Sequence, residues 1–168
     1  KLMKGFVGSA NIAVAGGDDG VARALVAAYG EDVVPVARED IDRADLILLV
    51  DADTAQQHPV LYGRVERAQE RGGAKVAAIM AEGTGRYLGE DFRVGARPGT
   101  QARLLIGLLH ALWESGHVDH AFMDAHVVLP PDFGAALAPG NDIWTVARDC
   151  GVEPTAVRRL VEMVAASR

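Results

Sequence analysis

The sequence predicts an α/β protein, a doubly wound three-layer sandwich built around a parallel sheet. Short apolar runs alternate with stretches of helical period along most of the 168 residues. One of the runs, "LILLV" at residues 46–50, is apolar at every position. Such a strand is typical of parallel sheets, which are covered by helices on both faces. Right-handed crossovers between parallel strands then place helices on each side of the sheet.

The first half of the chain supplies most of this pattern. Strands are predicted at residues 12–16, 33–37, 46–50 and 75–80, and helices at residues 18–30 and 58–73. Acidic residues at the start of the first helix and Gly30 after its end are typical helix boundaries. The loop at residues 16–20, "GGDDG", has the place of a phosphate loop but lacks the G-x-G-x-x-G spacing, so a capped turn is the preferred interpretation. We expect residues 46–50 to be the most buried run.

The second half adds one strand and then becomes helical. The piece "FRVGAR" at residues 92–97 predicts a short strand, and residues 100–116 predict the most regular amphipathic helix of the chain. Further helices are predicted within residues 120–127, 141–151 and 155–167, with a Pro- and Gly-containing link at residues 129–140. We therefore divide the chain into an α/β domain, residues 1–128, and a helical extension packed on it, residues 129–168.

Composition excludes several classes of protein. The net charge of −6 argues against nucleic acid or an anionic membrane as the main partner, and no apolar run reaches the ~18 residues of a membrane span. The single cysteine, Cys150, excludes an internal disulfide framework and is expected in the core. We expect a cytoplasmic location. Since the chain does not begin with Met, we also expect it to be an excised segment of a longer protein.

Several blocks resemble one known family. "KLMKGFVGSANI", "EDIDRADLILLV", "HPVLYGRVERAQERGGAKV" and "CGVEPTAVRRLVEMVA" occur in the order of corresponding blocks in molybdopterin oxidoreductases, and the first is similar to the large catalytic subunit of prokaryotic nitrate reductases. The resemblance implies a Rossmann-like domain. It also implies a parent enzyme of several hundred residues that carries a molybdenum bis(molybdopterin guanine dinucleotide) cofactor. This chain would be a fragment of such an enzyme or a cofactor-poor relative of it.

The resemblance also indicates where the cofactor would lie. The family generally shows Gly-x-Asn after the buried strand, where this chain has Asp51 and Asp53, and Asp-Pro-Arg after the next strand, where it has Glu82. Only the "RPGT" segment is retained. The implied cofactor-binding residues are Asp51, Asp53, His58, Glu82, Arg97, Gly99 and Thr100. Three carboxylates in place of amide and cationic groups are expected to weaken the binding of a pyrophosphate. No catalytic residue and no metal ligand can be assigned.

Other side chains have both a chemical and a structural interpretation. Asp51 and Asp53 have the oxygen ligands that Mg²⁺ prefers, but solvated turn carboxylates are the simpler interpretation. His58 before Pro59 marks a helix start more readily than it marks a general base. The four histidines at positions 110, 117, 120 and 126 match no ordinary zinc spacing.

Three functions follow from these observations. The first is a domain of a nitrate-reductase-like enzyme that reduces an oxyanion by two-electron oxygen-atom transfer, incomplete as an active site alone. The second is a cofactor-free structural or interaction domain derived from that family. In either case the expected partners are the remaining domains of a larger oxidoreductase or a partner subunit, with no nucleic acid and no membrane.

The third function is a DNA-binding helix-turn-helix at residues 145–161. Its charges are evenly balanced, whereas DNA binding depends on uncompensated cations. We therefore expect Arg158 and Arg159 to face solvent without recognising DNA. The apolar anchors expected in this region are Trp144, Val146, Val157, Leu160 and Val164.

Overall fold

The computed structural model describes residues 6–8, 19–30, 36–83 and 89–167. The chain divides into two compact units, residues 1–37 and residues 38–168, and each is described by itself. The predicted strand at residues 12–16 lies outside the described residues, as do residues 33–35 of the second predicted strand and residues 16–18 of the "GGDDG" loop. Val36 and Ala37, the described end of that second strand, are not part of a strand.

The first unit contains helix α1, Asp19–Tyr29. The helix ends at Gly30, whose N–H donates to Val26 O at 2.9 Å. Gly30 has a φ of +81°, in the left-handed region that a residue with a Cβ atom rarely adopts. The predicted end of this helix is therefore confirmed, and its cause is the glycine after the last turn.

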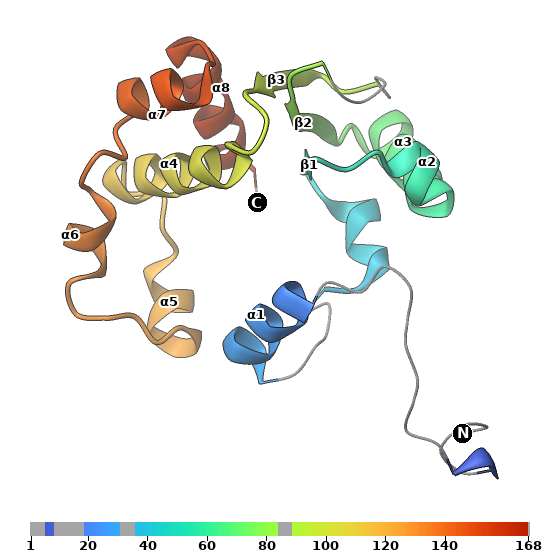
Figure 1. The fold of residues 1–168 in the computed structure, drawn as a ribbon. Coiled ribbons are helices and arrows are strands. Elements are labelled where there is room, and N and C mark those ends of the chain that lie inside the picture. Colours follow the sequence, from blue (N-terminus) through green and yellow to red (C-terminus); the bar gives the residue numbers. More distant parts are fainter. Residues whose placement is uncertain (1–5, 9–18, 31–35, 84–88, 168) are drawn as a thin grey trace. The chain divides into compact units, whose positions relative to one another are not determined.

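The second unit is built on a three-stranded parallel sheet (Figure 1). Its strands are β1 (Leu46–Val50), β2 (Lys75–Ala81) and β3 (Phe92–Ala96), in the order β1-β2-β3. Leu48 is paired with Ala77, and Ile79 with Val94. The α/β class and the parallel pairing predicted from the sequence are confirmed.

Helices connect and follow these strands. They are the 3₁₀ helix η2 (Arg38–Arg43) before β1, α2 (Thr54–Gln57) and α3 (Pro59–Gly72) between β1 and β2, and α4 (Gln101–Glu114), α5 (His120–His126), α6 (Phe133–Leu137), α7 (Ile143–Cys150) and α8 (Pro154–Ala165) after β3. The link predicted at residues 129–140 thus contains a short helix. Phe133 of this helix packs edge-on against Trp113 of α4, with ring centroids 5.2 Å apart.

Helices cover both faces of the sheet, which gives the predicted three layers. Alternation along β2 directs Ala77 and Ile79 into the main core with α4, α7 and α8. The neighbouring residues Val76, Ala78 and Met80 are also buried, on the opposite face. Figure 1 shows α3 on the side of the sheet opposite to α4, α7 and α8.

The prediction that residues 46–50 are the most buried run is wrong. All five residues of β1 are only half-buried, whereas residues 76–80 of β2 are buried without exception. The reason is position, because β2 is the central strand and β1 lies at the edge of the described sheet. An uninterrupted apolar run indicates a strand covered on both faces, but it does not give the place of that strand in the sheet.

The helical tail joins the same core. Val146, Val157 and Leu160 are fully buried, and the half-buried Val164 packs against them, so these predictions are confirmed. Cys150 is likewise buried and free. The core includes residues on both sides of the boundary that we predict at residue 129. The division into two domains at that boundary stays a prediction.

Trp144 is not an anchor, contrary to the prediction. The residue is 64% exposed, and the guanidinium carbon of Arg158 lies 5.3 Å from the centre of its ring. Helical spacing explains this, because the inward face of α7 carries Val146, Ala147 and Cys150. Arg158 and Arg159 are exposed, as expected. The absence of DNA recognition by these arginines stays a prediction.

Among the described residues, no helix combines the length and the apolar character that a membrane crossing requires.

Candidate site at the carboxyl edge of the sheet

Three of the implied site residues follow the ends of three adjacent strands. Asp51 follows β1, Glu82 follows β2 and Arg97 follows β3. Because the strands are parallel, these ends meet at one edge of the sheet, which is where open α/β folds place their ligands. The structure therefore brings these three residues to the same edge, as the sequence predicts.

Asp51 closes the end of β1 through both its backbone and its side chain. Its N–H donates to Ile79 O at 2.9 Å, and its Oδ1 accepts the Ala81 N–H at 2.9 Å. Its φ of +46° is the one positive value among the non-glycine residues that the structure describes. Asp tolerates this left-handed conformation better than most residues do. The Asp51 carboxylate thus accepts a hydrogen bond from the Ala81 N–H, at the edge where open α/β folds bind their ligands.

The turn after Asp51 carries two further polar side chains. Asp53 caps α2, and its Oδ1 accepts the Gln56 N–H at 3.3 Å. Thr54 is only 4% exposed, and within the described residues its Oγ1 has no hydrogen-bond partner. This buried hydroxyl is a polar group that sequence reasoning missed, since a threonine at the start of a helix has no distinguishing signal.

His58 has a mainly structural position. It joins α2 to α3, and its N–H donates to Thr54 O at 2.9 Å while its carbonyl accepts the Tyr62 N–H at 2.9 Å. Its exposed side chain lines a hollow between η2 and α3 together with Arg38 and Arg64. Pro59 occupies the first turn of α3, where the missing N–H has no cost.

Glu82 joins the ends of the other two strands. Its N–H donates to Ala96 O at 2.7 Å, which extends the pairing of β2 with β3 by one residue. Its side chain is exposed. The carboxylates of Asp51 and Glu82 therefore add negative charge to the same edge.

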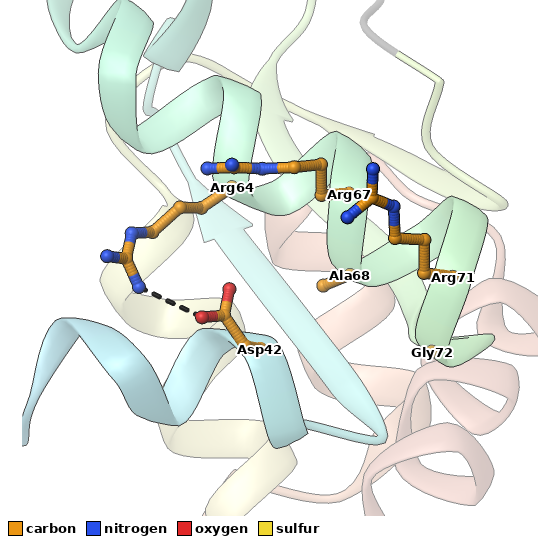
Figure 2. A pocket seen from close by; sticks show the side chains of 6 residues that line it. All are labelled: Asp42, Arg64, Arg67, Ala68, Arg71 and Gly72. Carbon is orange, nitrogen blue, oxygen red and sulfur yellow. Dashed lines mark hydrogen bonds and ion pairs between the residues drawn. The ribbon is translucent and has the colours of Figure 1, made fainter.

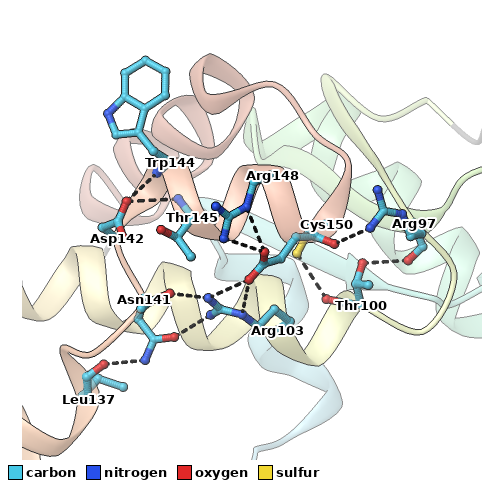
Figure 3. Close-up of polar contacts among 12 residues, drawn as sticks. Arg97, Thr100, Arg103, Leu137, Asn141, Asp142, Trp144, Thr145, Arg148 and Cys150 are labelled. Carbon is cyan, nitrogen blue, oxygen red and sulfur yellow. Dashed lines mark hydrogen bonds and ion pairs between the residues drawn. The ribbon is translucent and has the colours of Figure 1, made fainter.

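Arg97 is turned toward the end of α7 (Figure 3). Its N–H donates to Cys150 O at 2.7 Å, and its Nη1 donates to Asp149 O at 3.0 Å. The last carbonyl groups of a helix lack partners within the helix and carry partial negative charge, which a cation stabilises. The cation of the retained "RPGT" segment thus stabilises the fold by binding the C-terminus of α7.

Gly99 and Thr100 form the turn between β3 and α4. The Thr100 N–H donates to Arg97 O at 3.1 Å, and the Thr100 hydroxyl donates to the same oxygen at 2.7 Å. Gly99 has a φ of +82°, as a type II turn with Pro98 before it requires. These two residues therefore have a clear conformational role.

The four histidines differ in burial. His110 is buried in α4, whereas His117, His120 and His126 are exposed. The ring of His117 lies 2.9 Å from the Ser115 hydroxyl oxygen. In the part of the chain that the structure describes, no three His, Cys, Asp or Glu side chains are grouped to hold a metal ion.

The described residues of this edge do not fit a pyrophosphate. A bound pyrophosphate needs backbone N–H groups and cationic side chains. Here the Ala81 N–H is bonded to Asp51, Arg97 is bonded to α7, and Glu82 adds a second carboxylate. An edge of this composition is suited to hydrogen-bond donors or cations.

Comparisons with known proteins agree with the fold and with the resemblance. The sequence profile described as molybdopterin oxidoreductase matches residues 1–158. A nitrate reductase from Klebsiella oxytoca is 35% identical over 90% of this chain, and one from Shewanella frigidimarina is 32% identical over 98% of it. This chain covers only 17% and 18% of those two proteins.

A solved structure supports the fold independently. Acetylene hydratase from Pelobacter acetylenicus superposes on 73% of this chain with a TM-score of 0.62, at 17% identity and over 17% of its own length. The profile match extends over most of the chain, and the two nitrate reductases are similar over nearly all of it. The chain therefore belongs to the molybdopterin oxidoreductase family, as a domain related to nitrate reductases.

Proposed function

We propose that this chain is a scaffold domain of a nitrate-reductase-like molybdopterin oxidoreductase. In the whole enzyme, two electrons and two protons would convert nitrate, or a similar oxyanion, into the reduced oxyanion and water. The remaining domains would supply the catalytic centre, since this chain covers less than a fifth of the nitrate reductases it matches.

The observation that carries this proposal is the backbone at the end of β1. Asp51 adopts a left-handed φ of +46°, a conformation that suits glycine best, and the family resemblance places a glycine at this position. The backbone here thus has the conformation that a glycine would adopt most readily, although the side chain is a carboxylate. The cofactor expected in the whole enzyme is the bis(molybdopterin guanine dinucleotide) form, held mainly by residues outside this edge.

Metal and pterin analysis tests this proposal. The purified whole enzyme should contain molybdenum and a guanine-containing pterin, and should form nitrite from nitrate with a reduced dye as electron donor. The 168-residue chain alone should contain neither and should be inactive. A whole enzyme without molybdenum would contradict the proposal.

A second candidate, a cofactor-free interaction domain, is supported by a different observation. The Asp51 carboxylate, 2.9 Å from the Ala81 nitrogen, satisfies a donor that a bound phosphate would otherwise use. The same analysis separates the two candidates, because a whole protein that folds and assembles without pterin would support this second one.

A further inference from the structure

A groove with several cationic side chains lies between η2 and α3, and of the implied site residues its lining includes only His58. It consists of two hollows of about 380 Å³ each that share Arg64 in their linings. The charged and titratable residues that line them are Arg38, Asp42, His58, Arg64, Arg67 and Arg71. We call these residues and the space between them the arginine groove. At 1.5 Å per residue, α3 gives it a length of roughly 20 Å.

Arg64 crosses the middle of the groove and is already neutralised. Its Nη1 lies 3.0 Å from an Asp42 oxygen, and its Nη2 lies 3.5 Å from a Glu39 oxygen. Figure 2 shows its guanidinium directed at Asp42 of η2. Arg64 therefore holds η2 against α3. Its ion pair also neutralises Asp42, the one carboxylate among the described residues that line the groove.

Arg67 and Arg71 have no such ion pair with any residue that the structure describes. The Nε of Arg67 donates to the Gly63 carbonyl of its own helix at 3.0 Å, a bond that leaves the positive charge uncompensated. Arg71 is one turn further along α3, and Figure 2 shows the two side chains on the same side of the helix. Glu66 and Glu70 of this helix line neither hollow. Like charges four residues apart destabilise a helix slightly, so an anion bound between the two guanidinium groups would relieve their repulsion.

We propose that the arginine groove binds an extended acidic segment of another polypeptide, with carboxylates paired to Arg67, Arg71 and Arg38. Guanidinium groups bind carboxylates through two parallel hydrogen bonds, and among the described residues these arginines, unlike Arg64, have no carboxylate partner. An elongated groove fits a chain segment of about six extended residues better than it fits one small anion. This inference goes beyond the proposed function, because it identifies a surface for a partner subunit or a neighbouring domain.

The test uses the 168-residue chain and a fluorescent six-residue glutamate peptide at about 50 mM salt, where exposed charges are weakly screened. Fluorescence anisotropy should show saturable binding, and the glutamine peptide of the same length should not bind. The double variant Arg67→Gln, Arg71→Gln should weaken binding roughly fivefold, the effect of losing two exposed ion pairs.

A matched control removes the same charge elsewhere. Arg148 and Arg159 have side chains that are 76% and 60% exposed, so the double variant Arg148→Gln, Arg159→Gln should change binding less than about twofold if the groove is the site. Equal weakening by both double variants would overturn the proposal in favour of non-specific attraction. Absence of saturable binding, or binding of inorganic phosphate but not of the peptide, would also overturn it.

Discussion

Gly107 of α4 lies against Val146 of α7 in the core. A Cβ atom added at Gly107 would lie 2.5 and 2.7 Å from the two methyl carbons of Val146 and 3.0 Å from its Cβ. Carbon atoms pack best at about 3.5–4.0 Å. Val146 is fully buried, and its branched side chain has one preferred rotamer in a helix, so it cannot turn away. The substitution Gly107→Ala should therefore push α4 and α7 apart.

The expected loss of stability follows from two opposing effects. Overpacking a core costs about 1–3 kcal/mol, whereas replacing a helical glycine by alanine gains up to about 1 kcal/mol. We expect Gly107→Ala to lower the free energy of unfolding by about 1–2 kcal/mol in urea denaturation followed by circular dichroism. Gly63→Ala in α3 is the matched control, because its added Cβ meets nothing within 4 Å. That control should be neutral or stabilising.

A double variant tests the cause. Val146→Ala removes both clashing methyl groups, so in a double-mutant cycle Gly107→Ala should cost less in the Val146→Ala background than in the native chain. If Gly107→Ala were as stable as Gly63→Ala, or if its cost did not depend on residue 146, the packing of α4 against α7 described above would be refuted.

Three further predictions concern polar contacts. Asp51→Ala should lose about 1–2 kcal/mol in urea denaturation, because it removes the bond to Ala81 and leaves a Cβ at a positive φ, whereas Asp51→Gly should stay within about 1 kcal/mol of the native chain; equal losses would contradict this. Arg103 joins α4 to Asp149, Asn141 and the Gly140 carbonyl (Figure 3), so Arg103→Ala should cost about 1–2 kcal/mol, and Arg103→Lys should recover less than half because its ammonium lacks the planar fork. Full recovery by lysine would be evidence against this network. Asp142 caps α7, and hydrogen bonds from Thr145 and then Trp144 hold the pKa of its carboxyl below the usual 3.8. Its stabilising effect should be complete above pH ~4 and be lost as the pH falls through the lowered pKa, so the native chain and Asp142→Asn should differ in urea midpoint at pH 6 and converge toward pH 2; a constant difference would refute the role of the charge.

Most of the elements could be predicted from the sequence because their signals are local. Apolar runs and helical periods fall within single strands and helices, and Gly30 ends α1 through its own backbone. The relative burial of β1 and β2 depends on their order in the sheet, which no single segment encodes. The apolar character of Trp144 predicts a place in the core, but Val146 and Cys150 already occupy the inward face of α7.

The candidate site likewise has features that local sequence predicts and features that it does not. Strand ends and the carboxylates that follow them can be located by spacing, so the sequence predicts Asp51 and Glu82 at the edge where the structure has them. Their partners could not be predicted, because the bond from Ala81 to Asp51 spans 30 positions and the bond from Arg97 to Asp149 spans 52. Such contacts depend on how the elements pack, and they decide which groups remain for a ligand.

The central claim is that the carboxyl edge of this sheet is closed to a pyrophosphate by its own side chains. Isothermal titration calorimetry with guanosine diphosphate tests it most directly, on the native chain and on the triple variant Asp51→Gly, Asp53→Asn, Glu82→Arg. The triple variant removes three negative charges, adds one positive charge and releases the Ala81 N–H, and each charge-assisted hydrogen bond gained is worth about 1.5–3 kcal/mol. We predict no measurable binding to the native chain and detectable binding to the triple variant. Tight binding of guanosine diphosphate to the native chain would contradict the claim.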